Sequence, residues 1–210
     1  MNPNFRTPPI VKNLIIVNVL IYIAITLIPS VESVAARYCQ LYWFTAVDKL
    51  QNQPLFHSWQ FITYMFLHGS FSHLFFNMFA LWMFGRTLEQ RLGPQRFMTY
   101  YIVCGVGAAL IQMGVAWLTG DASIVLIGAS GAVMGLLLAF GVMYPNAQML
   151  VFPIPFPIKA KWFVIGYAAI ELFFGATGFD LGVAHFAHVG GMLWGWLLLT
   201  YWKRRGKIWY

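Results

Sequence analysis

The sequence predicts an all-α polytopic membrane protein, a compact bundle of six transmembrane helices in one domain over residues 1–210. Hydrophobic residues make up 60% of the chain and charged residues only 9%, and the mean hydropathy is +0.69. A soluble domain carries about 25% charged residues, so lipid must surround most of this protein. Six apolar stretches have lengths near that needed to cross a hydrocarbon core. They cover residues 12–29, 69–86, 97–118, 129–144, 162–178 and 185–202.

Composition also excludes several kinds of partner and cofactor. The formal charge of +7 does not indicate nucleic acid, because the basic residues are scattered between apolar stretches and do not share one face. The two cysteines, Cys39 and Cys104, form neither a disulfide framework nor a zinc-site spacing. We therefore expect a lipid bilayer as the surroundings, no metal and no cofactor.

The first stretch resembles a cleavable signal peptide, since Ser33-Val-Ala35 follows a basic and then apolar start. Charge argues that it is retained as a helix. With six crossings both termini are on one side, and every Lys and Arg except Arg37 and Lys49 is then on that side. Cytoplasmic loops carry the excess of Lys and Arg, so both termini are predicted to be cytoplasmic. We expect a multi-pass integral protein of a bacterial plasma membrane.

Residues 30–58 are expected to form a long external loop at the membrane interface. This segment contains the aromatic run from Leu41 to Phe44, which is typical of an amphipathic interfacial element. The alternative is a lip beside a functional site, and the two interpretations are compatible.

Polar side chains within the apolar stretches are costly in lipid and therefore indicate functional positions. They are His73, Asn77, Ser130, Glu171, His185 and His188. Ser130 precedes the helix-ending Pro145 by 15 residues, which is about 22 Å of helix. His188 likewise precedes Lys203 by 15 residues, so both side chains are predicted at one depth, several ångströms below the outer surface.

A short helix starting at Ser130 requires the preceding segment, residues 119–127, to descend into the membrane. Irregular backbone at that depth is tolerated where it lines a water-filled cavity, and hydrolysis needs such a cavity. The small-residue pairs Gly131-xxx-Gly135 and Gly191-xxx-Gly195 would let the fourth and sixth helices approach closely.

These residues predict serine hydrolase chemistry. His188 is the expected base that takes the proton of the nucleophile Ser130. Asn77, His73 and the backbone N–H of Ser130 are the expected donors to the oxyanion.

Three ordered motifs are carried by the chain: His73-xxx-Asn77, Gly128-Ala-Ser130-Gly131 and Ala187-His188-xx-Gly191. On these motifs the sequence resembles the rhomboid family of intramembrane serine proteases, from about Trp59 to Gly195. Gly85-xxx-Glu89-xxx-Gly93 is a looser match that looks structural in rhomboids.

The resemblance implies a Ser130–His188 dyad with no acidic third member, assisted by His73 and Asn77 and supported by Gly128, Gly131 and Gly191. It also implies single-pass membrane proteins as substrates, cut near the outer end of their transmembrane helix without a metal or cofactor. Many rhomboids have an aromatic residue four positions after the serine, where this chain has Met134. A thioether can also contact an imidazole ring favourably.

Other histidines and Glu171 have alternative interpretations. His185 is expected to be structural, and His57 and His68 interfacial. Glu171 is expected to bond within the helix bundle, with orientation of the dyad as the alternative. Two rival functions remain: a non-catalytic rhomboid relative that binds membrane proteins, and a haem- or metal-binding membrane protein that uses the histidines. A zinc metalloprotease is excluded because no H-E-x-x-H motif occurs.

Overall fold

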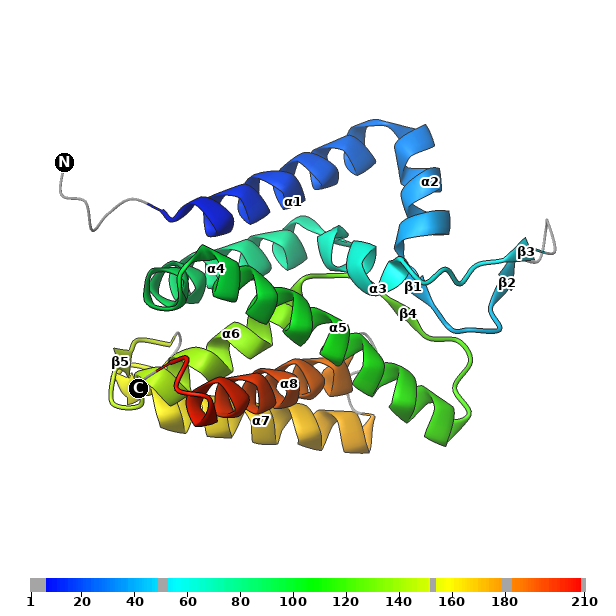
Figure 1. Cartoon of the computed structure of the whole chain (residues 1–210). Helices are drawn as coiled ribbons and strands as arrows, with labels where there is room; N and C mark the ends of the chain where they lie inside the picture. The colour runs from blue at the N-terminus through cyan, green and yellow to red at the C-terminus, as the bar shows by residue number, and fades with distance from the viewer. Residues whose placement is uncertain (1–6, 49–52, 152–153, 179–182, 209–210) are drawn as a thin grey trace.

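The protein is an all-α bundle with three very small two-stranded sheets in its connections (Figure 1). The computed structural model describes residues 7–48, 53–151, 154–178 and 183–208. Its helices are α1 (Pro9–Leu27), α2 (Pro29–Cys39), α3 (Gln60–Thr63), the 3-10 turn η2 (Tyr64–Phe66), α4 (Phe71–Leu92), α5 (Pro94–Thr119), α6 (Ser130–Met143), α7 (Ala160–Thr177) and α8 (His185–Arg204). The strands are β1 (Leu41–Tyr42), β2 (Val47–Asp48), β3 (Gln53–Pro54), β4 (Val125–Leu126), β5 (Gln148–Met149) and β6 (Ile158–Lys159).

Helices α1, α4, α5, α6, α7 and α8 lie over the six apolar stretches, with shifted ends. The largest shift is at the end of α4, which continues to Leu92 and not only to residue 86. Gly93 ends it with a φ of 79°, a conformation that favours glycine, and Pro94 then begins α5, a position where proline's missing N–H costs nothing. Arg6 and Lys49, which entered the charge argument, lie outside the described residues.

Residues 30–58 are not one loop. Pro29 begins a second helix, α2, directly after α1, and strands β1, β2 and β3 follow it. Proline is favoured at the first position of a helix, and it breaks the continuity of the preceding one. Strand β1 pairs antiparallel with β4, which joins Leu41 to Leu126 and Tyr42 to Val125. Through this pairing, the segment after α2 fixes the position of β4, which lies a few residues before Ser130.

The outer surface of the bundle is apolar. Two of the described helices, α1 and α5, are long and apolar enough to cross a membrane, and α6 is apolar but shorter. Large side chains on the outward faces are exposed in the isolated molecule, among them Leu20, Phe76, Trp117 and Phe173. Extended exposed apolar surfaces are rare on soluble monomers and mark contact with lipid or protein.

Helices α5, α6 and α8 form the centre of the bundle and pack most extensively against one another. A Cβ on Gly191 of α8 would lie 1.9 Å from the carbonyl oxygen of Gly131, so glycine lets α8 touch the backbone of α6. A Cβ on Gly195 would instead lie 2.2 Å from the Tyr100 hydroxyl of α5. The two glycine pairs therefore meet at Gly131 and Gly191, whereas Gly195 accommodates α5.

The Gly85-xxx-Glu89-xxx-Gly93 segment joins α4 to the start of α1. Both carboxylate oxygens of Glu89 accept hydrogen bonds, from the backbone N–H groups of Ile10 at 3.0 Å and Val11 at 2.8 Å. A carboxylate satisfies N–H groups that the first turn of a helix leaves unpaired and complements the helix dipole. A Cβ on Gly85 would lie 2.9 Å from the Val11 side chain, so the glycine permits this approach.

Replacing Glu89 with alanine is expected to lower the free energy of unfolding by about 3 kcal/mol, because the two charge-assisted hydrogen bonds of a buried carboxylate are lost. Denaturant unfolding in detergent micelles measures it. Glu32→Ala is the matched control, since Glu32 is an exposed acid of α2 and its replacement should cost less than about 0.5 kcal/mol. Equal stability of the two variants would contradict the capping role of Glu89.

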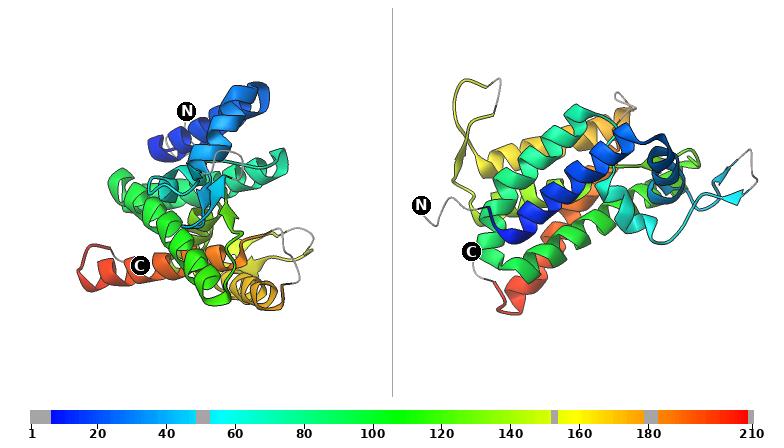
Figure 2. Two further views of the ribbon diagram at one scale, coloured as in Figure 1. Left: turned by 90° about the vertical axis from the view of Figure 1, so that its right-hand side faces the viewer. Right: turned by 90° about the horizontal axis from the view of Figure 1, so that it is seen from above.

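The helices alternate in direction, so their ends form two groups. Helices α4, α6 and α8 begin at the end of the bundle where the β2–β3 hairpin protrudes, and the β5–β6 hairpin lies at the opposite end (Figures 1 and 2). At that opposite end the Arg96 guanidinium donates to the carbonyl of Lys207 at 2.8 Å, which links the start of α5 to the chain after α8. The described chain thus begins and ends at one end of the bundle (Figure 1).

Candidate active site

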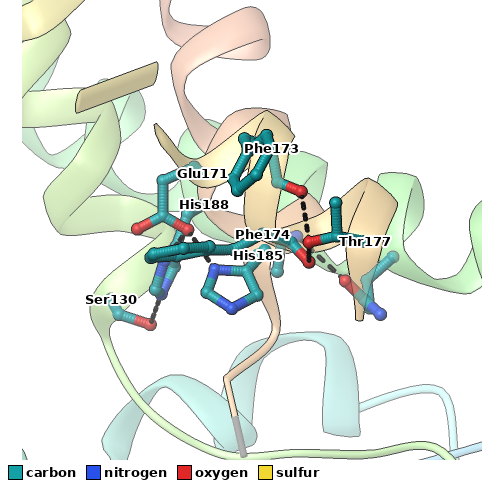
Figure 3. Close-up of polar contacts among 9 residues, drawn as sticks. Ser130, Glu171, Phe173, Phe174, Thr177, His185 and His188 are labelled. Atoms are coloured by element: carbon teal, nitrogen blue, oxygen red, sulfur yellow. Dashed lines mark hydrogen bonds and ion pairs between the residues drawn. The ribbon is translucent and has the colours of Figure 1, made fainter. Parts of the chain in front are cut away.

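Ser130 and His188 meet where α6 and α8 begin. The Ser130 hydroxyl oxygen lies 2.9 Å from Nε2 of His188, although the residues are 58 positions apart (Figure 3). Ser130 is the first residue of α6, and His188 lies one turn into α8 with 8% of its surface exposed. The separation is within the range that proton transfer between a hydroxyl and an imidazole requires.

The His73 ring, on α4, lies against the chain segment that precedes Ser130. The N-terminus of α4 is capped by Ser70, whose hydroxyl accepts the backbone N–H of His73 at 3.1 Å. Gly128 has a φ of 113°, and a Cβ there would lie 2.7 Å from two atoms of the His73 ring. Glycine at 128 is thus required both by the backbone conformation and by the imidazole beside it.

Asn77 lies one turn further along α4 and is buried. Its side-chain nitrogen donates to the carbonyl oxygen of His73 at 2.9 Å. An amide has two N–H groups, so one remains for another acceptor. The backbone N–H of Ser130 has no partner within its own helix, because it is the first residue of α6.

A cavity of about 660 Å³ joins these groups. Ser130, His188, His73 and Asn77 line it, and so does Met134. Strand β4 and the residue after it, Ile127, form one side, so the irregular chain before α6 borders a cavity. Its volume suits a peptide segment, and its walls combine apolar side chains with a few polar groups, as ligand sites usually do.

A carboxylate lies on the other side of the His188 ring. Oε2 of Glu171, on α7, is 3.0 Å from Nδ1 of His188 and 2.7 Å from Nδ1 of His185 (Figure 3). The His185 contact has hydrogen-bond geometry, whereas the 3.0 Å contact of His188 Nδ1 lacks it. Glu171 does bond within the bundle, and it also contacts the histidine of the expected dyad.

Comparison with known proteins identifies the family. Residues 56–205 match the model of the rhomboid domain. The chain belongs to the rhomboid family. It is 28% identical over 201 residues to rhomboid protease AarA of Providencia stuartii, covering 84% of this chain and 71% of that protein. It is 33% identical over 144 residues to the mitochondrial rhomboid protein 1 of Saccharomyces cerevisiae, covering 63% of this chain and 40% of that one.

The human presenilin-associated rhomboid-like protein of mitochondria is 30% identical over 217 residues, covering 95% of this chain and 52% of that protein. This rhomboid therefore spans about half the length of the mitochondrial relatives it matches. Its family and its apolar helices make it a membrane protein. Because relatives are mitochondrial as well as bacterial, the expected assignment to a bacterial plasma membrane is not supported.

One of the other histidines, His68, differs from expectation. In this rhomboid His68 is buried, not interfacial, and its ring packs edge-on against His73 with centroids 5.0 Å apart. His57 stacks on Trp59 with centroids 4.4 Å apart, away from the cavity. His185 contacts the carboxylate that also meets His188, and its structural role stays a prediction.

Two polar residues that hold the site were missed by the sequence analysis. The Gln112 side-chain oxygen accepts the backbone N–H of Ala187 at 3.0 Å, so α5 caps the start of α8. The Tyr64 carbonyl accepts the N–H of Gly128 at 2.9 Å, which anchors the chain before Ser130. Both residues are uncharged, and the sequence does not show which neighbouring segment each of them faces. No motif therefore identifies them.

Among the described residues, one group of acidic, histidine and cysteine side chains is close enough to hold a metal ion. Glu171, His185 and His188 each offer a ligand atom, and these atoms lie within 4.8 Å of one another. Imidazole and carboxylate suit a transition metal such as zinc. The same three groups already contact one another, so removal of metal ions is a direct test of the rival metal-binding function.

Proposed function

We propose that this rhomboid is an intramembrane serine endopeptidase that cleaves single-pass membrane proteins. One observation carries the proposal: a serine hydroxyl and an imidazole nitrogen lie 2.9 Å apart on a cavity within an apolar bundle. Membership of a family that includes the protease AarA supports it. Ser130 is the proposed nucleophile and His188 the proposed base.

The His188 imidazole acts first as a base and then as an acid. Nε2 of His188 takes the hydroxyl proton as Ser130 Oγ bonds to the substrate carbonyl carbon, and the carbonyl oxygen becomes an oxyanion. His188 then returns the proton to the leaving nitrogen as the peptide bond breaks, which leaves an acyl-enzyme. A water molecule, deprotonated by His188 in turn, hydrolyses this ester and regenerates Ser130.

Three donors are proposed for the oxyanion: the backbone N–H of Ser130, the free amide N–H of Asn77 and the His73 imidazole. Each belongs to the wall of the cavity beside Ser130. Preorganised donors at developing charge contribute strongly in a site that excludes bulk water. Gly128 and Gly131 support this arrangement, since larger side chains would collide with His73 and with Ala108.

Met134 occupies the position at which the family's aromatic residue is expected. It lines the cavity together with His188 and is half-buried. We propose that its thioether limits the movement of the His188 ring, as sulfur contacts with aromatic rings are favourable.

We propose six membrane crossings with both termini on the cytoplasmic or equivalent inner side. The basic residues Lys12, Arg91, Arg96, Lys159 and Lys203 lie at or near the helix ends opposite the site, as the positive-inside rule requires. Arg37, at the site end, forms an ion pair with Asp48 and so adds no net positive charge there. Ser130 and His188 then lie toward the outer side.

Cleavage is expected at a small residue in the outer part of a substrate's transmembrane helix or just beyond it. A helical peptide bond must unwind before serine can attack it, and Gly and Pro disfavour a helix by about 1 and 3 kcal/mol relative to Ala. Replacing such residues near the cut with Leu should suppress cleavage. Mass spectrometry of the products measures the position; a cut at the inner end, or indifference to Leu, would contradict the proposed depth.

The activity itself is tested with purified protein in proteoliposomes, a single-pass reporter and a serine-reactive fluorophosphonate. Labelling at one serine and cleavage of the reporter support the proposal, and EDTA should change neither rate, because no step uses a metal. Absence of both labelling and cleavage would favour the non-catalytic rhomboid relative. Activity that is lost in EDTA and restored by zinc would favour a metal at Glu171, His185 and His188.

A further inference from the structure

The buried carboxylate of Glu171 has no role in a two-residue mechanism. Only 5% of this residue is exposed, and it lies on α7, the helix that contributes fewest buried residues among the long helices around the site. An unpaired charge in such surroundings would cost several kcal/mol, so a buried ionisable group needs a partner and a reason. Among its partners are two imidazoles of α8, beside the Tyr167 side chain of its own helix.

His188 lies between Ser130 and Glu171. Its Nε2 faces the Ser130 hydroxyl at 2.9 Å, and its Nδ1 faces Oε2 of Glu171 at 3.0 Å. A neutral imidazole carries one proton, and an ionised carboxylate only accepts hydrogen bonds. The carboxylate therefore favours the proton on Nδ1, which leaves Nε2 with the lone pair that must accept the serine proton.

His185 fixes the carboxylate in this place. Its Nδ1 donates to the same Oε2 at 2.7 Å, with better alignment than His188 achieves. Close approach of α7 to α8 is permitted by Gly175, because a Cβ there would lie 3.1 Å from the Phe186 ring and 3.2 Å from Cβ of His185. Residues of α7 and α8 thus fix the position of the carboxylate together. Figure 3 shows the side chains of Glu171 and His185.

We propose that Glu171 is a positioning residue that acts on the reaction through His188, and that the hydrogen bond from His185 holds the Glu171 carboxylate in place. The inference rests on the proposed protease function. When the Ser130 proton moves to Nε2, the ring becomes an imidazolium with N–H groups on both nitrogens. Glu171 takes no proton; its charge stabilises that cation until the proton passes to the leaving nitrogen. The arrangement is a Ser–His–Glu triad in place of the expected dyad.

The alternative is a structural role, in which Glu171 merely bonds α7 to α8. The two roles differ in what they change. A positioning residue lowers kcat while the substrate binds as before, whereas a structural residue lowers the fraction of folded, reactive enzyme. Endpoint labelling by the fluorophosphonate counts reactive enzyme, and the rate of labelling reports how readily Ser130 loses its proton.

Glu171→Gln is the first variant, because it keeps the shape and removes the charge. We expect kcat to fall about 10- to 100-fold, with KM within about threefold of wild type and an unchanged labelling endpoint. The effect should be smaller than the roughly 10⁴-fold loss known for the aspartate of a serine protease triad, because the His188 N–H is not aligned with the carboxylate. Glu171→Asp restores the charge, so its kcat should be at least threefold higher than that of Glu171→Gln.

Tyr100→Phe is the matched structural control. It removes one buried hydrogen bond between two helices, from the Tyr100 hydroxyl of α5 to the Gly135 carbonyl of α6 at 2.8 Å, and it leaves His188, His185 and Glu171 untouched. We expect a lower thermal midpoint with kcat within about threefold of wild type. Combining Glu171→Gln with His188→Ala should lower activity no further than His188→Ala alone, because both changes act on one imidazole.

Each outcome decides between the two roles. A Glu171→Gln enzyme whose kcat per labelled site stays within threefold of an active wild type would overturn the inference, as would additivity in the double variant. If Glu171→Gln labels to a lower endpoint than wild type, His185→Gln is the deciding variant. A several-fold lower kcat with an unchanged KM would then support the positioning role, and an unchanged kcat would overturn it. A wild-type protein that neither labels nor cleaves contradicts the proposed function instead.

Discussion

Replacing Ser130 with alanine is expected to abolish both reporter cleavage and fluorophosphonate labelling, with at least about a 10⁴-fold loss in turnover; loss of the nucleophile of another serine protease costs about 10⁶-fold. The Ser130 side chain carries the one hydroxyl within hydrogen-bonding distance of His188 among the described contacts. Alanine removes a single oxygen in the first turn of α6 and favours the helix, so the thermal midpoint should stay near that of wild type. Gel fluorescence and mass spectrometry of the labelled peptide measure the result.

Ser72→Ala is the control for this variant. Ser72 lines the same cavity, but its hydroxyl contacts Ser70 at 3.1 Å and not an imidazole. Labelling and cleavage should persist in Ser72→Ala. Labelling that survives in Ser130→Ala would show that another serine reacts and that the nucleophile is misassigned.

Replacing His188 with alanine is expected to lower turnover at least about 10³-fold, because Ser130 loses the group that accepts its proton. Substrate binding should change far less, so KM should remain within a few fold. Steady-state kinetics with a transmembrane reporter in proteoliposomes separate the two parameters. His185→Ala should retain measurable activity, since its contact with Ser130 is indirect, through Glu171 and His188.

The matched control for the histidine is His57→Ala. His57 stacks on Trp59 and contacts the carbonyl of Leu55 at 3.1 Å, away from the cavity. Its replacement should leave turnover unchanged. An inactive His185→Ala beside an active His188→Ala would mean that the base had been assigned to the wrong histidine of α8.

The sequence alone determined which stretches are helical, which family the chain belongs to and which residues are candidates for chemistry. These features are local. A run of apolar residues in lipid must form a helix to satisfy its backbone hydrogen bonds. Gly93, Gly120 and Gly178 each end the helix that precedes them, with a positive φ that favours glycine. The motifs around His73, Ser130 and His188 are short, so spacing within one segment identifies them.

Contacts between helices were decided only by the tertiary structure. For Glu171 the sequence left bonding within the bundle and orientation of the dyad both open, because the rotation of α7 about its axis depends on where Gly175 lets Phe186 approach. The contacts of Glu89 at the start of α1 and of Gln112 at the start of α8 likewise depend on how the helices pack. The aromatic run also led to the prediction of a single loop over residues 30–58, where α2 begins at Pro29 and β1 pairs with β4.

The physical reason is that lipid constrains a helix surface only to be apolar, and many rotations satisfy that condition. Packing of backbone against backbone, as at Gly131 and Gly191, selects one rotation for each pair of helices. That selection brings the imidazole of His188 to the hydroxyl of Ser130 on one side and to the carboxylate of Glu171 on the other. The chain thus encodes its reactive residues locally, and their partnership arises from the packing of α6, α7 and α8.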